Sequence, residues 1–292
     1  MKIILAQHFG MCFGVRDALA QAEQLADAAP LTILGELVHN PVVQERLRAR
    51  HIGEGALDRV QADSRRVMIT AHGASDQSRA AWRTAGYEIA DGTCPLVRNA
   101  HAQLRGLVGA GYFPVVIGQA GHVEVRGLTE DFPDAVVVEV ASDLLKLPRC
   151  DRYGVISQTT QPIEHAHRMV AQLQSLHGRA EVRFVDTVCQ PTKNRQFALR
   201  ELIAQAEMIV VVGGRDSNNT RQLATACRSA GRRTVHIERA AELRATDFAG
   251  IQVVGLTAGT STLRETVAAV QARLEEISTD QHSQPIQEKP CL

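Results

Sequence analysis

Three cysteines of this 292-residue chain begin the same local pattern, which therefore repeats along the sequence. In each copy three residues, a basic residue and then Asp or Asn follow the cysteine: Cys12 with Arg16-Asp17, Cys94 with Arg98-Asn99, and Cys189 with Lys193-Asn194. A strand-like stretch precedes each cysteine, over residues 3–6, 87–90 and 182–185. Recurrence at a period of roughly 80–95 residues predicts three related units, rather than the two domains that length alone suggests.

The similarity between the copies continues beyond each cysteine. Apolar residues after Cys12 fall on one helical stripe, at positions 15, 18, 19, 22, 25 and 26. A short strand ending in glycine follows in all three copies, at Gly35, Gly118 and Gly213. A third strand then runs into a small polar loop, over residues 67–73, 154–160 and 254–261. Strands that alternate with helices predict parallel sheets and an α/β fold.

We therefore expect three related α/β domains in a pseudo-threefold arrangement. The predicted domains are residues 12–93, residues 94–188, and residues 189–278 together with the N-terminal strand 1–11. Residues 279–292 are polar and include two prolines, so we expect a flexible tail there.

Composition and charge exclude several kinds of function. Lys+Arg 32 balances Asp+Glu 32, which argues against a nucleic-acid or membrane-surface binder, because such proteins usually carry a basic face. The longest apolar runs are too short to span a bilayer, and the N-terminus has no signal-peptide cleavage pattern. No lysine follows a Gly-x4-Gly, and no Gly-x-Gly-x-x-Gly lies between a strand and a helix. The sequence therefore argues against a nucleotide-binding enzyme of the common kinds. We expect a cytoplasmic protein.

In the cytoplasm, cysteines indicate catalysis or metal binding rather than disulfides. Ligands in open α/β sheets bind beyond the carboxyl ends of the strands, where Cys12, Cys94 and Cys189 all lie. A single such cysteine is usually a small buried apolar residue, but three equivalent ones predict a shared metal site. Zinc in structural sites prefers four ligands in close pairs, so three separated thiolates favour an iron–sulfur cluster with an open fourth iron.

The other three cysteines are not expected to be ligands. Cys227 lies on an apolar helix stripe, Cys150 in a loop between two arginines, and Cys291 in the tail.

Polar residues gather in the loops that follow the predicted strands. They comprise three histidines and several hydroxyl and amide residues: His39, His72, His122, Thr159, Thr160, Ser217, Asn218, Asn219 and Ser261. Ordinary turns and helix caps also use such residues. Their concentration beside helix starts suits a phosphate, because backbone N–H groups and the helix dipole favour an anion there.

One acidic residue belongs to the same loops. Glu124 lies two residues after His122 at a strand end. On an extended segment such neighbours point to the same side, so we expect both side chains to face the same ligand.

Several short motifs, taken in order, resemble the 4-hydroxy-3-methylbut-2-enyl diphosphate reductase family. They include Gly10-Met-Cys12-Phe-Gly-Val15, Glu36-Leu-Val-His-Asn40, Ala71-His-Gly73, Thr93-Cys-Pro-Leu-Val97, Gly121-His-Val-Glu124, Gln158-Thr-Thr160, Asn194-Arg-Gln196, Ser217-Asn-Asn219 and Thr257-Ala-Gly-Thr-Ser261. The resemblance runs from about residue 2 to residue 277.

The resemblance implies three α/β domains around one [4Fe–4S] cluster, held by Cys12, Cys94 and Cys189 and leaving a fourth iron open. It implies removal of an allylic hydroxyl with two electrons and two protons, giving isopentenyl and dimethylallyl diphosphates plus water. Ferredoxin or flavodoxin would deliver the electrons. Glu124 would supply protons, and Thr159 would assist near the hydroxyl. The substrate diphosphate would contact His39, His72, His122, Ser217, Asn218, Asn219 and Ser261.

The chain departs from the family pattern at three places. Phe9-Gly10-Met11 precedes Cys12, where a basic residue, Gly and Phe are usual, and Phe13 follows it. Val123 replaces a usual proline, and Asn218 stands where serine is common. None of these changes removes a predicted ligand or acid.

Two other functions remain open on the residues alone. A cluster-containing dehydratase would use the open iron as a Lewis acid without net reduction. A non-catalytic iron–sulfur sensor would use cluster loss as its signal. Consumption of reducing equivalents distinguishes a reductase from a dehydratase.

Overall fold

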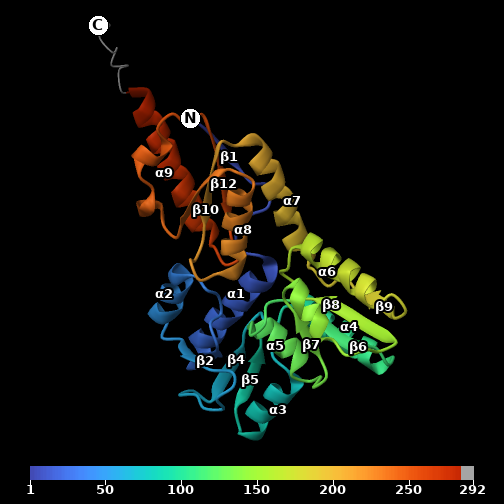
Figure 1. Ribbon diagram of the computed structural model, residues 1–292. Helices are drawn as coiled ribbons and strands as arrows, with labels where there is room; N and C mark the ends of the chain where they lie inside the picture. The colour runs from blue at the N-terminus through green and yellow to red at the C-terminus, as the bar shows by residue number, and fades with distance from the viewer. Residues whose placement is uncertain (284–292) are drawn as a thin grey trace. The chain divides into compact units, whose positions relative to one another are not determined.

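The computed structural model describes residues 1–283, in which three four-stranded sheets are built entirely from parallel strand pairs (Figure 1). One sheet has the order β3-β2-β4-β5, with β2 (Leu31–Leu34), β3 (Gly53–Gly55), β4 (Arg66–Ile69) and β5 (Glu88–Asp91). A second has the order β7-β6-β8-β9, with β6 (Phe113–Ile117), β7 (Val136–Val138), β8 (Arg152–Ser157) and β9 (Glu181–Phe184). The third has the order β11-β10-β12-β1, with β1 (Lys2–Leu5), β10 (Met208–Val212), β11 (Arg233–Ile237) and β12 (Val253–Ala258).

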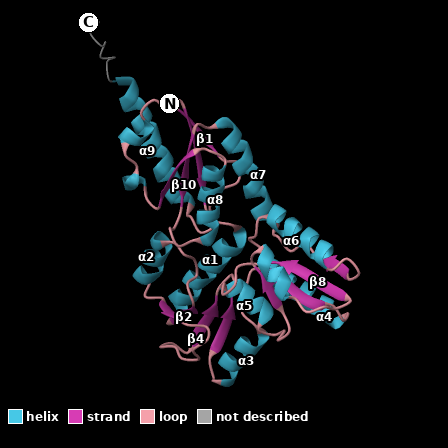
Figure 2. Ribbon diagram, viewed as in Figure 1, coloured by secondary structure: helices cyan, strands magenta, loops and turns pink. Residues whose placement is uncertain are grey.

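Helices connect the strands, as parallel pairing requires (Figure 2). The α-helices are α1 (Phe13–Ala28), α2 (Pro41–Ala49), α3 (Asp76–Thr84), α4 (Pro95–Gly109), α5 (Val123–Thr129), α6 (Ile163–Leu176), α7 (Gln190–Gln205), α8 (Asn218–Ser229) and α9 (Arg264–Ser283). Short 3₁₀ segments are η1 (Ala141–Lys146), η2 (Ala240–Glu242) and η3 (Ala245–Phe248). The predicted α/β class with three parallel sheets is confirmed.

The three sheets share one connectivity. In each, the second strand in the sheet order is bordered by an edge strand, and the third strand pairs with the strand that leads into a cysteine. The third sheet obtains this last strand from the N-terminus, since β1 pairs with β12 from Lys2↔Val253 to Leu5↔Leu256. A common connectivity places the three cysteines at equivalent ends of equivalent strands.

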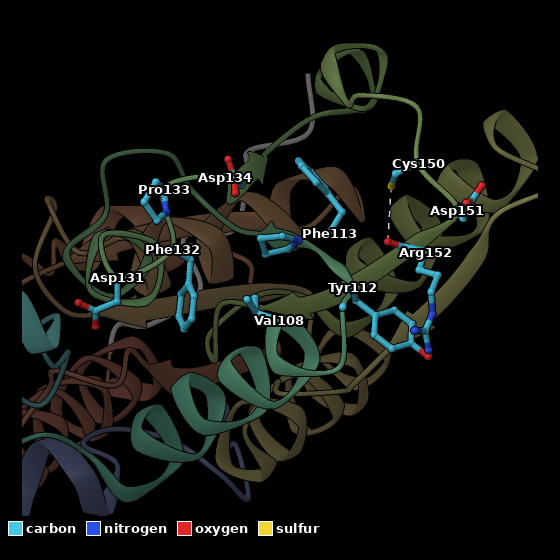
Figure 3. Close-up of a pocket in the computed structure, with 12 residues that line it drawn as sticks. Val108, Tyr112, Phe113, Asp131, Phe132, Pro133, Asp134, Cys150, Asp151 and Arg152 are labelled. Carbon is cyan, nitrogen blue, oxygen red and sulfur yellow. Dashed lines mark hydrogen bonds between the residues drawn. The ribbon is translucent and has the colours of Figure 1, made fainter.

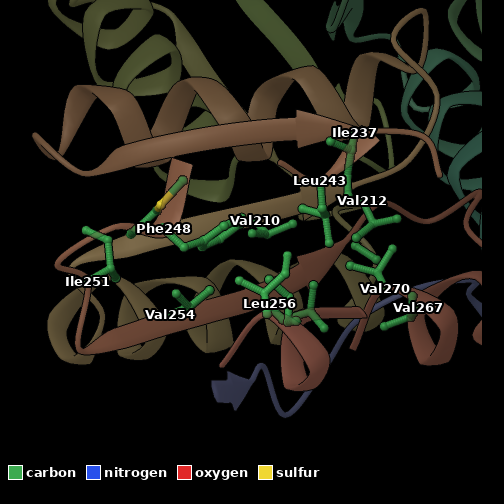
Figure 4. Packing of buried hydrophobic residues seen from close by; sticks show 14 residues of the cluster. Val210, Val212, Ile237, Leu243, Phe248, Ile251, Val254, Leu256, Val267 and Val270 are labelled. Atoms are coloured by element: carbon green, nitrogen blue, oxygen red, sulfur yellow. The ribbon is translucent and has the colours of Figure 1, made fainter. Parts of the chain in front are cut away.

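Apolar layers on both faces of the sheets bury the central strands. Every residue of β10 is buried, which is typical of a parallel strand that helices cover on both sides. Figure 4 shows one of these layers, where Val210 and Leu256 of the sheet pack with Phe248 of η3 and Val270 of α9. The buried sheet gives the polar loops at its carboxyl edge a rigid base.

The chain divides into two compact units. The first unit comprises Met1–Cys12, Val38–Glu45 and Arg195–Leu292, and the second comprises Phe13–Leu37 and Arg46–Asn194. The second unit therefore contains two of the sheets, and the first contains the third. The predicted domain bounds, at residues 12–93, 94–188 and 189–278 with 1–11, stay a prediction.

Some elements differ from the sequence analysis. The edge strands β3, β7 and β11 were not anticipated, and β3 consists of Gly-Glu-Gly, which has little strand propensity of its own. Helix α9 continues through Ser283, so residues 279–283 are helical where a tail was expected. The remainder of that expected tail, residues 284–292, lies outside the described residues, as does Cys291.

Candidate active site

Each of the three repeated cysteines immediately precedes a helix, because α1 begins at Phe13, α4 at Pro95 and α7 at Gln190. In each case the cysteine N–H donates to a carbonyl two residues beyond the end of the neighbouring strand. The bonds are Cys12 to Thr260 at 3.4 Å, Cys94 to Ala71 at 3.0 Å, and Cys189 to Thr159 at 2.9 Å. The sequence repeat is therefore a repeat of backbone geometry.

This position suits thiolates that hold an iron–sulfur cluster. The N-terminus of a helix presents unpaired N–H groups and a partial positive charge, which stabilise an anion. Cys12, Cys94 and Cys189 are all partly exposed and form no disulfide. A Cβ atom on Gly14 would lie 2.6 Å from Sγ of Cys94, so only glycine permits this approach two residues after Cys12. The chemistry of three partly exposed thiols at helix N-termini fits such a group.

The structure does not by itself assemble the three thiols. Cys12 belongs to the first unit, whereas Cys94 and Cys189 belong to the second. Among residues 1–283, no group of three or more His, Cys, Asp or Glu side chains has the geometry of a metal site. Ligation by all three cysteines therefore stays a prediction.

Glu124 is the most perturbed acid in the second unit. Its side chain is only 2% exposed, and Oε1 accepts a 2.6 Å hydrogen bond from the N–H of Thr159. Burial raises the pKa of Glu124 to about 7, although hydrogen bonds from the backbone and side chain of Thr159 act in the opposite direction. A carboxyl group with such a pKa is protonated in a large fraction of molecules near neutral pH and can donate that proton.

The expectation that His122 and Glu124 lie on an extended segment is wrong. Helix α5 begins at Val123, and His122 is its N-cap, whose Nδ1 accepts from the N–H of Glu124 at 3.1 Å. The helix start places Glu124 in the first turn, where its side chain turns inward and is buried. His122 still faces another predicted site residue, because its ring meets that of His72 edge-on with centroids 5.5 Å apart.

Thr159 links the acid to a predicted cluster ligand. Its N–H binds Glu124, and its carbonyl accepts from the N–H of Cys189. The preceding residue, Gln158, is fully buried, and its Oε1 accepts from the N–H of Gln119 at 3.0 Å. The structure therefore brings Glu124, Thr159 and Cys189 together at the carboxyl edge of one sheet.

Three of the predicted site residues of the first unit, Ser217, Asn218 and Asn219, lie at the start of α8. Ser217 is its N-cap, with Oγ accepting from the N–H of Thr220 at 3.4 Å, and Asn218 is the first residue of the helix. Oδ1 of Asn219 accepts from the N–H of Thr260 at 3.0 Å, so this residue also holds the loop after β12. Capping accounts for part of this arrangement, and the N-terminus of α8 also offers an anion its N–H groups.

His39 lies against the same loops. A Cβ on Gly214 would approach the carbonyl oxygen of His39 to 2.0 Å, so only glycine allows these two segments to meet. The next residue, Asn40, is buried and donates from Nδ2 to the carbonyl of Ser261 at 2.9 Å. The structure therefore groups His39 with Ser261 and with the loop leading to Ser217.

Ser261 carries a polar atom whose hydrogen bond is missing. The residue is 5% exposed, and within the described part of the chain its Oγ has no hydrogen-bond partner. A buried hydroxyl without a partner costs free energy, which a ligand oxygen at this place would recover.

The remaining cysteines in the described residues do not belong to these loops. Cys227 is completely buried in an apolar cluster, and burial raises the pKa of its thiol to about 11, as expected for a packing residue. Cys150 lines a cavity of about 600 Å³ at the amino ends of β6 and β8, with Phe113, Phe132 and Arg152 (Figure 3). That end of the sheet is opposite to the carboxyl edge where the predicted site residues lie.

Two aspartates near the repeated cysteines were not predicted from the sequence. Asp91 and Asp186 each stand three residues before a repeated cysteine and bind the residues around it. The signal was present, since an aspartate at this position occurs in two of the three copies.

Comparison with known proteins relates this geometry to one family. The family model described as "LytB protein" matches residues 3–275. A protein of Pelobacter propionicus named 4-hydroxy-3-methylbut-2-enyl diphosphate reductase is 38% identical over 281 residues, which is 95% of this chain and 99% of that protein.

Two solved structures are also similar. A structure described as (E)-4-hydroxy-3-methyl-but-2-enyl diphosphate reductase, the terminal enzyme of the non-mevalonate pathway, has 31% identity and a TM-score of 0.70, covering 94% of this chain and 100% of that one. The Plasmodium falciparum reductase has the same fold, with a TM-score of 0.84 at 23% identity, covering 98% of this chain and 89% of that one.

Proposed function

The chain belongs to the LytB family, and from this premise we propose that it is an iron–sulfur reductase of 4-hydroxy-3-methylbut-2-enyl diphosphate. The reaction breaks the allylic C–O bond. Two electrons and two protons convert the substrate hydroxyl to water and leave a C–H bond, giving isopentenyl or dimethylallyl diphosphate. The observation that carries the proposal is the buried Glu124. Its carboxylate accepts a hydrogen bond from the N–H of Thr159, whose carbonyl accepts from the N–H of Cys189.

We assign a [4Fe–4S] cluster to Cys12, Cys94 and Cys189, leaving one iron without a protein ligand. When bound, this cluster supplies the electrons and an electron-accepting site for the substrate oxygen. Ferredoxin or flavodoxin is the proposed electron donor. Reduced cysteine ligands need a reducing compartment, so we also propose a cytoplasmic location.

Proton supply falls to Glu124. Hydroxide is a poor leaving group, so C–O cleavage needs a proton on the departing oxygen. With a pKa of about 7, Glu124 holds its proton at the start of the reaction and can release it to a developing hydroxide. The N–H of Thr159 then stabilises the carboxylate that remains, because it already points at Oε1.

The residues that we assign to diphosphate binding are histidines and neutral hydrogen-bond donors of the two units. In the first unit these are His39, Ser217, Asn218, Asn219 and Ser261, and in the second they are His72 and His122. Ser261 supports this assignment most directly, since its buried Oγ needs a partner that the described residues do not supply. Thr159 is assigned to the region of the substrate hydroxyl, beside Glu124.

The test is an anaerobic assay of reconstituted protein with a reduced viologen dye and the diphosphate substrate. We expect two equivalents of dye oxidised for each isopentenyl or dimethylallyl diphosphate formed, with Cys94→Ser as the inactive control. Water loss without dye oxidation would indicate a dehydratase. A stable cluster with no turnover of this substrate would indicate a sensor.

A further inference from the structure

Two of the three repeated cysteines lie within side-chain arrangements that share the same two contacts and that the proposed reaction does not use. In the first, Oδ1 of Asp91 accepts from the N–H of Thr93 at 3.0 Å, and Oδ2 pairs with the guanidinium of Arg98 at 3.4 Å. In the second, Oδ1 of Asp186 accepts from the N–H of Val188 at 3.0 Å, and Oδ2 pairs with Nζ of Lys193 at 2.5 Å. Both arrangements lie in the second unit.

The two arrangements occupy the same places relative to the cysteine. The aspartate stands three residues before Cys94 or Cys189, and the basic residue stands four residues after it, on the first turn of α4 or α7. One carboxylate therefore ties the backbone just before the cysteine to the helix just after it. We call each arrangement an aspartate clip, comprising Asp91 with Arg98 and Asp186 with Lys193.

The loop of Cys12 has no such clip. Phe9 stands where the aspartate would be, and Arg16 pairs with the adjacent Asp17, with both side chains 65% exposed. This loop is held differently, because Nη2 of the buried Arg195 donates to the carbonyl of Gly10 at 2.6 Å. The basic residue after the cysteine is thus common to all three copies, but its aspartate partner is present in two.

We propose that Asp91 and Asp186 are positioning residues that hold the loops of Cys94 and Cys189 in a ligand-ready conformation before any cluster binds. This inference rests on the proposed assignment of these cysteines as ligands. A side chain that accepts from the N–H two residues ahead restricts the turn, and the ion pair restricts the helix start. Together they leave the cysteine N–H directed at the neighbouring loop carbonyl, as observed.

The clip of Asp186 offers the cleaner test. Asp91 also contacts Arg79, whose Nε lies 3.3 Å from Oδ2, so changes at Asp91 disturb a larger network. Asp186→Asn keeps an oxygen that can accept from Val188 but removes the ion pair with Lys193. Lys193→Gln removes the same ion pair from the other side, and Lys193→Arg preserves it with the residue type found at Arg98.

The first measurement uses the full-length protein without cluster, treated anaerobically with N-ethylmaleimide, with each cysteine followed by peptide mass spectrometry. Opening of a loop exposes its thiol, so a weakened clip speeds alkylation. We expect Asp186→Asn and Lys193→Gln each to speed alkylation of Cys189 about two- to fivefold, the range of an exposed ion pair. Asp186→Ala also loses the hydrogen bond from the N–H of Val188, so it should speed alkylation of Cys189 on the order of tenfold. Lys193→Arg should match the unaltered protein.

Internal controls come from the same molecule. Alkylation of Cys12 should not change in the Asp186 and Lys193 variants, and Arg16→Gln, which alters the basic residue of the copy without a clip, should not change it either. Asp186→Asn and Lys193→Gln shift the local charge in opposite directions. If charge alone governed the reactivity of the thiol, the two variants would change the rate in opposite directions, and that result would overturn the proposal, as would unchanged rates in both.

The second measurement is iron release from reconstituted protein to a chelator. We expect faster iron release from Asp186→Asn and Lys193→Gln. Lys193→Arg and Arg16→Gln should release iron at the rate of the unaltered protein. Equal release from all variants would overturn the role in ligand positioning. If the unaltered protein binds no iron, the proposed function fails, whereas the alkylation series still decides whether the clip orders the loop.

Discussion

The backbone N–H of Thr159 lies 2.6 Å from Oε1 of Glu124, while the carbonyl of Thr159 accepts from the N–H of Cys189. One residue therefore holds both the buried acid and the loop of a predicted cluster ligand. Because this bond stabilises the ionised carboxylate, it opposes the effect of burial on the pKa of Glu124. The pKa is therefore about 7, a value suited to a general acid near neutral pH.

Removing the acid should abolish most turnover. Glu124→Gln keeps the shape and an oxygen that can accept from Thr159, so we expect iron content and substrate binding to remain. Turnover should fall about 10²–10⁴-fold, the usual contribution of a positioned general acid. Anaerobic steady-state kinetics measure this, with Glu54→Gln on the exposed edge strand as control. Near-full turnover would indicate that water or His122, rather than Glu124, supplies the proton.

Thr159→Val should shift the pH dependence of turnover. The change removes the hydroxyl, whose hydrogen bond lowers the pKa of Glu124, and leaves the backbone bond in place. The pKa should rise further, so the decline of kcat at alkaline pH should move to a higher pH than in the unaltered protein. A pH–rate series shows this shift, and a decline that moves to lower pH would contradict the assignment.

Burial of Glu124 should also make folding stability depend on pH. Its pKa is raised from 4.5 to about 7, so the folded state retains a proton that the unfolded state has already lost between these values. The stabilisation is fully present below pH 4.5 and is lost as pH rises to about 7, a change of about 3 kcal/mol. Urea unfolding of the cluster-free protein at pH 5 and pH 7.5 measures the difference. The difference should be smaller in Glu124→Gln, and an equal dependence would assign it to other groups.

Ser261→Ala should separate binding from stability. The Oγ of Ser261 is buried without a partner among the described residues, so its removal should leave the free energy of unfolding unchanged or slightly higher. Affinity for the diphosphate should fall about tenfold if Oγ donates to a phosphate oxygen. Calorimetric titration gives the affinity, and His39→Ala and His72→Ala should weaken it by a similar factor. Unchanged affinity together with lost stability would reject the binding role.

The cysteines should separate into ligands and packing residues. Ser in place of Cys12, Cys94 or Cys189 should lower the iron content of anaerobically prepared protein, whereas Cys150→Ser and Cys227→Ser should keep it. Cys227→Ser should instead lower stability by about 1–3 kcal/mol, because it buries a hydroxyl in an apolar cluster. Iron analysis with thermal unfolding checks both halves, and equal iron in all three ligand variants would refute the assignment.

Much of the fold could be predicted because it depends on local patterns. The strand that leads into each cysteine, the helix after Cys12 and the α/β class all follow from short-range periodicity and the residues that end each element. The edge strand β3 could not be predicted, because Gly53–Gly55 becomes a strand only through its pairing with β2.

The sequence by itself determined which side chains follow the ends of the strands: three equivalent cysteines, one glutamate and a set of histidines and neutral donors. Only the tertiary structure decided how these groups behave. Glu124 and Thr159 are 35 residues apart, and Asn40 and Ser261 are 221 apart, so neither contact follows from any local pattern. The raised pKa of Glu124 and the partnerless hydroxyl of Ser261 exist because folding removes water from both, and that desolvation depends on which distant segments pack around each residue.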